Sequence, residues 1–98
     1  MELIDINEQI EFKEEFMPKK LRVTDKYRVP LICMEAGQKI PPHPSGAGIF
    51  YIISGKAVMT VDGKETEVTA GNMIFVEDDE TRGIRALEKL VAFAVRIG

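Results

Sequence analysis

Turn-forming residues interrupt this chain at short intervals and leave only short segments between them. The turn signals are Pro41-Pro42, Ser54-Gly55, Asp62-Gly63, Ala70-Gly71 and the acidic run from Glu77 to Glu80. The intervening segments are rich in β-branched and aromatic residues, which is typical of strands. They predict strands over residues 29–34, 49–53, 57–61, 73–76 and 90–97. Five prolines and eight glycines also argue against a helix bundle, so we expect an all-β fold.

The dipeptide Asp62-Gly63 gives the sharpest local prediction. Asp-Gly tolerates the positive φ angles of a two-residue hairpin turn, so residues 57–61 should pair with residues 65–69. Evenly spaced short strands joined by such turns predict a sandwich or a barrel.

The first twenty residues carry a mixed signal. Leu3, Ile6 and Ile10 fit a helical stripe, while Ile10 and Phe12 fit strand alternation. We expect residues 1–20 to form an N-terminal extension or an extra strand, and we favour the strand.

The length and charge of the chain exclude several classes of protein. Its 98 residues suffice for one domain, residues 1–98, and the net charge of −3 with scattered basic residues argues against a nucleic-acid partner. No segment approaches the roughly 20 apolar residues that cross a bilayer, and we see no secretion signal. The single cysteine, Cys33, cannot form an internal disulfide. These features predict a cytoplasmic protein with no membrane partner.

Two segments resemble the sequence motifs of the cupin superfamily. Residues 37–55, GQKIPPHPSGAGIFYIISG, resemble its first motif, which runs Gly, five residues, His-x-His, a few residues, Glu, six residues, Gly. Residues 71–82, GNMIFVEDDETR, have the spacing of its second motif, which runs Gly, five residues, Pro-x-Gly, two residues, His. The resemblance implies a small single-domain cupin: an antiparallel β-barrel of jelly-roll type (a double-stranded β-helix) over residues 29–97, expected to be a homodimer.

Many cupins hold a divalent metal through three histidines and one glutamate, and most of these ligands have no counterpart here. His43 matches the first histidine, Ser45 stands at the second, Gly48 at the glutamate and Arg82 at the last histidine. Alternatively, His43 is the second histidine and Pro41 stands at the first. Either alignment leaves one ligand of four, and a metal needs three or four converging donors. We therefore expect no metal and no other cofactor.

His43 and Arg82 each allow two interpretations. His43 either faces the barrel cavity and hydrogen-bonds a ligand, or is an idle, partly exposed loop residue between two prolines. Arg82 either clamps an anion at the barrel mouth, or points outward or pairs with an acid of the run 77–80. For Arg82 we favour the second, because arginine near several carboxylates usually pairs with one of them.

The predicted strand at 49–53 suggests an apolar cavity. If Gly48 faces inward, alternation turns Phe50 and Ile52 inward as well. With His43, Ser45 and Arg82 near the rim, such a cavity suits a small, mostly apolar ligand with one anionic or polar group. It suits equally a filled core without a ligand.

The sequence is compatible with three functions. We favour a metal-free module that binds a small molecule or assists another protein, rather than an enzyme. The alternative is a metal-dependent isomerase, epimerase or dioxygenase with atypical ligands, such as His43, Cys33 and acids of the run 77–80, although Cys33 fits better as a buried thiol. The third is a purely structural or partner-binding protein. The apolar segment 90–95 is either core or a dimer interface.

Overall fold

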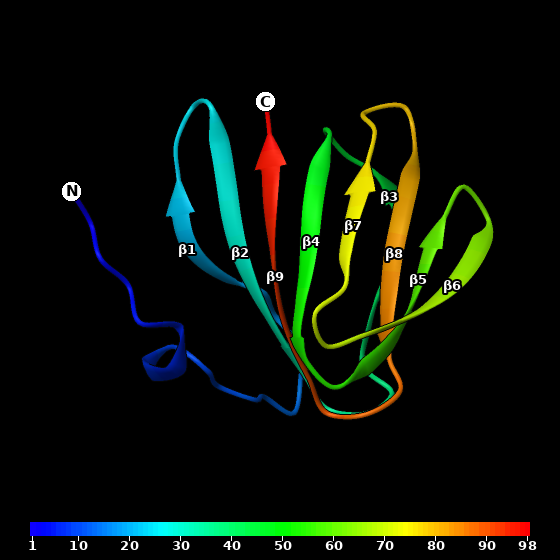
Figure 1. Cartoon of the computed structure of the whole chain (residues 1–98), viewed down its shortest axis with the longest axis horizontal. Helices are drawn as coiled ribbons and strands as arrows, with labels where there is room; N and C mark the ends of the chain where they lie inside the picture. Colours follow the sequence, from blue (N-terminus) through cyan, green and yellow to red (C-terminus); the bar gives the residue numbers. More distant parts are fainter.

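The computed structural model describes all residues, 1–98, and consists of two antiparallel β-sheets packed face to face (Figure 1). The five-stranded sheet has the order β1-β2-β9-β4-β7, and the four-stranded sheet has the order β3-β8-β5-β6. The strands are β1 (Lys19–Val23), β2 (Tyr27–Met34), β3 (Lys39–Pro44), β4 (Gly48–Ser54), β5 (Lys56–Val61), β6 (Lys64–Thr69), β7 (Met73–Val76), β8 (Thr81–Ala86) and β9 (Leu90–Ile97).

The five strands predicted from composition are all present, within two residues at each end. The hairpin is confirmed as well. Asp62 and Gly63 both have positive φ, 48° and 80°, and β5 pairs with β6 from Val61↔Lys64 onward. Two positive φ angles in a two-residue loop match the right-handed twist of the flanking strands, which is why Asp-Gly is favoured there.

Two local predictions are wrong. Pro41-Pro42 is not a turn but lies within β3, where the register shifts between Ile40 and His43. Proline is tolerated there because β3 is an edge strand and the bulge removes the need for its missing N–H. Residues 1–18 form no strand: their only regular element is the 3₁₀ turn Ile6–Glu8, and β1 begins at Lys19.

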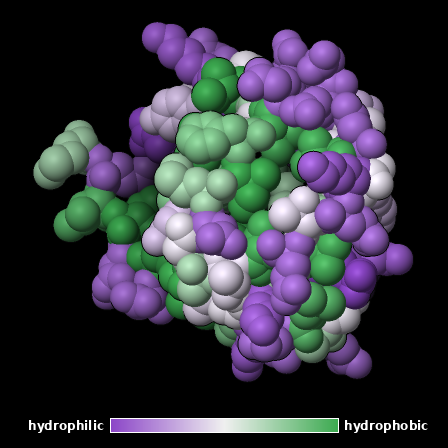
Figure 2. All heavy atoms as spheres, turned by 45° about the vertical axis from the view of Figure 1, so that its right-hand side comes forward, coloured by the Kyte–Doolittle hydropathy of each residue, from purple (hydrophilic) through white to green (hydrophobic).

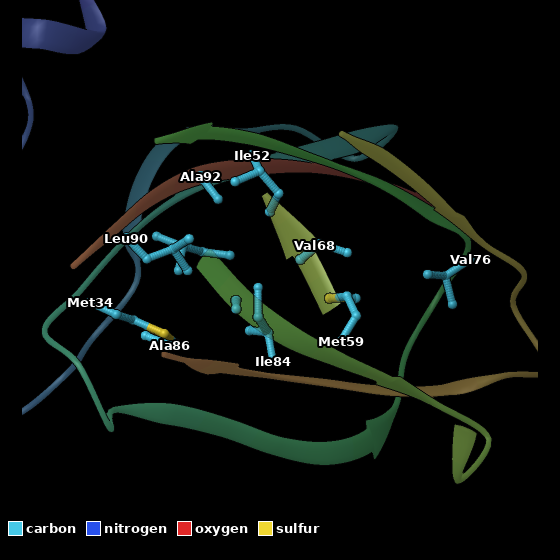
Figure 3. Close-up of a cluster of buried hydrophobic side chains, with 11 residues drawn as sticks. Met34, Ile52, Met59, Val68, Val76, Ile84, Ala86, Leu90 and Ala92 are labelled. Atoms are coloured by element: carbon cyan, nitrogen blue, oxygen red, sulfur yellow. The ribbon is translucent and has the colours of Figure 1, made fainter. Parts of the chain in front are cut away.

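The two sheets share one core but do not close into a hydrogen-bonded barrel. Each sheet keeps two free edges, β1 and β7 in one and β3 and β6 in the other. The architecture is therefore a double-stranded β-helix whose sheets face each other across the core. Figure 3 shows the side chains between them, and the core comprises Ile32, Met34, Ile52, Ala57, Met59, Val68, Val76, Ile84, Ala86, Leu90 and Ala92.

A second, smaller cluster lies on the outer face of the five-stranded sheet. Leu31, Cys33 and Val91 are buried there because the N-terminal arm packs across them with Ile6, Ile10 and Phe12. The apolar positions of the arm thus serve as a cover for the sheet rather than as a strand within it. No helix in the chain has the length and apolar character needed to cross a membrane.

The turn between β4 and β5 provides a test of this packing. Gly55 has φ +91°, and a Cβ there would collide with the Lys89 carbonyl oxygen, whereas Gly71 has φ +89° with nothing near its Cβ position. Both alanine variants adopt a strained left-handed backbone, which costs about 1–2 kcal/mol. Only Gly55→Ala adds overpacking, typically about 1–3 kcal/mol.

We expect Gly55→Ala to lower the free energy of unfolding by clearly more than Gly71→Ala, as measured by urea denaturation of both variants. Equal losses would show that the turns before β5 and β9 are not in contact.

Candidate functional site

A cavity of about 360 Å³ opens between the two sheets at the end of the molecule where the C-terminus lies, the top of Figure 1. Its apolar wall comes from both sheets, with Ile32 on β2, Phe50 on β4, and Ile40 and Ile84 on the paired strands β3 and β8. Ile32 and Ile84 also belong to the core. The cavity is therefore continuous with the core: both lie between the two sheets, and core side chains leave this end of the space unfilled.

The lining of this cavity is strongly cationic. Five basic residues line it, and no aspartate or glutamate does. They are Lys20, Arg22, Arg28, Arg82 and Arg96. The whole chain has 13 basic and 16 acidic residues, so the positive charge at the cavity is a local concentration and does not reflect overall composition.

Arg82 is the one buried charged side chain, 4% exposed, and it bonds to backbone carbonyls from two loops. Its Nη1 donates to the Gly46 oxygen at 2.6 Å, and its Nη2 donates to the Glu77 and Glu80 oxygens at 2.9 and 2.8 Å. Longer bonds run from Nη2 to the Ser45 oxygen, 3.4 Å, and from Nε to the Glu80 oxygen, 3.2 Å.

These bonds overturn the favoured interpretation of Arg82 as an outward-facing or ion-paired residue. No carboxylate of the run 77–80 pairs with it; the turn directs its carbonyls inward and leaves Glu77, Asp78 and Asp79 exposed. The rival interpretation, a bidentate anion clamp, is also limited, because guanidinium has five N–H groups and only one, on Nη1, lacks a carbonyl partner.

His43 lies on β3 directly across from Arg82 and lines the same cavity. Its side chain is exposed, and its Nδ1 lies 3.0 Å from the Pro41 carbonyl oxygen. Because a carbonyl only accepts, Nδ1 is the donor in this contact, and Nε2 has no hydrogen-bond partner within the chain.

The structure brings together four of the five predicted ligand-binding residues and separates one. His43, Ser45, Phe50 and Arg82 line the cavity. Ile52 faces inward as expected, but it is fully buried in the core, two residues deeper along β4, where neighbouring side chains leave no space.

The residues present do not fit the family's metal site. His43 is the only histidine of the chain, Gly48 offers no side chain, and Arg82 brings a positive charge to the position of an expected ligand. Nowhere in the chain are three or more His, Cys, Asp or Glu side chains arranged so that they could hold a metal ion. The atypical set is not assembled either: Cys33 is buried in the cluster on the outer face of the five-stranded sheet, away from His43.

Sequence reasoning missed four of the five basic cavity residues, Lys20, Arg22, Arg28 and Arg96. Alternation along 90–97 was a usable signal for Arg96, because the apolar residues Leu90, Ala92 and Ala94 precede it on one face. Arg28 lies one residue before the predicted start of its strand, and Lys20 lies on a strand that carries little apolar signal.

Comparison with known proteins agrees with this architecture. The model of the cupin domain family matches residues 30–95, and no curated protein sequence matches. A protein with a double-stranded β-helix domain from Klebsiella pneumoniae superposes with a TM-score of 0.88 at 20% identity, over 99% of this chain and 90% of the other. KdgF from a Halomonas species superposes with a TM-score of 0.79 at 17% identity, over 100% and 96%.

A conserved protein of unknown function from Streptococcus pyogenes is similar too, with a TM-score of 0.86, 20% identity, and coverage of 98% and 86%. These likenesses show a shared double-stranded β-helix fold. With the family match over most of its length, the chain belongs to the cupin family.

Arg82 generates a prediction about stability. Arg82→Lys keeps the charge but loses the planar fork that reaches carbonyls in two loops, and hydrogen bonds to charged groups contribute about 1.5–3 kcal/mol each. We expect the variant to lose about 2–4 kcal/mol of unfolding free energy in urea denaturation.

The matched control is Arg85→Lys, on the exposed face of the same strand, which should change the stability by no more than about 0.5 kcal/mol. If both variants unfold at the same urea concentration, the clamp contributes nothing to folding.

Proposed function

We propose that this cupin is a metal-free module that binds a small organic molecule with an anionic group in the cavity between its sheets. The observation that carries the proposal is the pairing of an apolar wall with a rim of basic residues and no acid. An apolar body then lies against Phe50 and Ile84, and the anionic group lies toward the rim. A volume of about 360 Å³ is at the small end of ligand sites, which limits the body to roughly one ring.

The chemistry of the lining argues for binding rather than catalysis. His43 is the only imidazole in the lining, and no carboxylate or second histidine lies in the cavity to act with it as an acid–base pair. The metal-dependent isomerase, epimerase or dioxygenase remains the rival, and it requires donors other than the family's own.

The test is a thermal-shift screen of aliphatic and aromatic carboxylates and phosphate esters against untagged, EDTA-treated protein. A compound present at about 100 times its Kd stabilises the folded state by about 2.7 kcal/mol, which raises the Tm by on the order of 10 °C. We expect at least one such shift in wild type and its loss in Ala94→Leu, because Ala94 is 4% exposed and lines the cavity.

The unliganded Tm of Ala94→Leu checks that the variant is folded, and elemental analysis tests the rival. Stoichiometric Fe, Mn, Ni or Zn in untagged wild type, absent from His43→Ala, would replace this proposal with the metal enzyme. An identical ligand shift in wild type and Ala94→Leu would move binding out of the cavity.

We further propose that the protein is a homodimer, with a second copy covering the outer side of β7. Segment 90–95 cannot supply the interface, because β9 is the central strand of its sheet and Leu90, Val91, Ala92 and Ala94 are buried. In contrast, β7 is an edge strand whose Met73 and Phe75 are 55% and 66% exposed. Figure 2 brings this side of the molecule forward and shows apolar side chains gathered among hydrophilic ones.

Light scattering coupled to gel filtration tests the dimer. Phe75→Lys places a charge in the apolar surface and should shift the protein from dimer to monomer. Leu87→Lys, at a position 40% exposed outside β7, makes the same change in charge and should leave the dimer intact. Monomeric wild type would rule the interface out.

A further inference from the structure

Two arginines of the cavity face each other without any compensating charge. Arg28 on β2 and Arg96 on β9 are direct partners in the antiparallel register. Arg28 precedes Ile32 and Met34 on the inner face of β2, and Arg96 follows Ala92 and Ala94 on the inner face of β9, so both side chains belong to the cavity face. Neither makes an ion pair.

Like charges placed directly opposite destabilise an antiparallel pair, so this arrangement works against folding. The Nε of Arg96 is in addition buried without any hydrogen-bond partner. It lies under the β3–β4 loop, where a Cβ built on Gly46 would be 3.7 Å from it. Buried donors in folded proteins nearly always have a partner, so an orphan beside a ligand cavity needs an explanation.

The other two arginines of the cavity, Arg22 and Arg82, both have hydrogen-bond partners. Four of the five N–H groups of Arg82 donate to carbonyls. Arg22 pairs with Glu2 at 2.7 Å and bonds the Tyr27 hydroxyl at 2.9 Å, and these bonds to Glu2 and Tyr27 raise the pKa of Arg22. Arg28 and Arg96, in contrast, make no ion pair and no side-chain hydrogen bond.

We propose that Arg28 and Arg96, with Lys20 beside them, recognise a doubly charged group of the ligand, a phosphate monoester or a dicarboxylate. Lys20 pairs with Pro30, two residues along β2 from Arg28, and lines the same cavity. Guanidinium groups match the oxygens of both anions in a bidentate manner, and a dianion neutralises two facing cations at once. This inference rests on the proposed function and names the chemical class of its ligand.

Isothermal titration calorimetry on untagged protein tests the assignment with four probes that share one ring. Phenyl phosphate and phthalate are dianions, benzoate is a monoanion, and benzyl alcohol is neutral. We expect one or both dianions to bind at least about tenfold more tightly than benzoate, and benzyl alcohol more weakly still. Which dianion binds more tightly distinguishes the phosphate from the dicarboxylate.

Arg28→Gln and Arg96→Gln should each raise the Kd of the preferred dianion by about tenfold or more, because each removes one bidentate charged contact. Arg85→Gln makes the same change in net charge on the exposed face of β8 and should leave the Kd within about twofold. The unliganded Tm is a second readout: both glutamine variants should melt at or above wild type, since each removes a repulsion, whereas a structural arginine would lower the Tm.

Dianion binding that survives both glutamine variants but is lost in Ala94→Leu would show that the ligand binds in the cavity without help from the arginine pair. If benzoate binds as tightly as the dianions, or if wild type binds no dianion, the proposed role of the arginine pair is also contradicted. Failure of the whole carboxylate and phosphate screen would instead overturn the proposed function.

Discussion

The open end of this β-sandwich depends on one buried guanidinium. Arg82 is the only charged side chain removed from solvent, and it joins carbonyls of the β3–β4 loop to carbonyls of the β7–β8 loop. Both loops lie at the cavity end of the molecule, where the apolar core ends. A single planar group with several donors in fixed directions is suited to this task. The cavity keeps its shape because these loops are held, and Gly46 then lies over Arg96.

The arginines around the cavity show how one residue type takes different roles from its surroundings. Arg22 is tied to the N-terminal arm through Glu2, and Arg82 is tied to the backbone. Arg28 and Arg96 have neither kind of partner and face each other. Folded proteins tolerate such local conflicts mainly where function requires them. The position that carries a metal-binding histidine in many cupins thus holds a structural arginine here, and the free cations lie on the opposite sheet.

Most of the sheet architecture was readable from the sequence because its signals are local. The Asp62-Gly63 turn fixes a hairpin by its own φ preferences, and the apolar segments at 49–53 and 90–97 leave little choice but buried strands. The sequence did not predict β1 and β3 because Lys, Arg and Pro dominate them, or β8 because Ile84 is its only large apolar residue. The pairing of these strands is imposed by their neighbours. In the site, His43 and Ser45 followed from motif spacing, and Phe50 followed from strand alternation with Gly48. The role of Arg82 did not, since its partners are carbonyls of residues as far as 37 positions away, which no side-chain pattern reveals.

The course of β9 has a practical consequence for handling this protein. The strand ends at Ile97, one residue after Arg96, so the last residues of the chain leave the fold at the rim of the cavity. A polyhistidine tag appended after Gly98 would begin at the rim of the cavity that His43, the only imidazole of the chain, also lines, and it would supply the metal-binding donors that the cavity lacks. Metal found in such a preparation would report on the tag. A fusion at the other terminus avoids this artefact, because the N-terminal arm passes over the outer face of the five-stranded sheet.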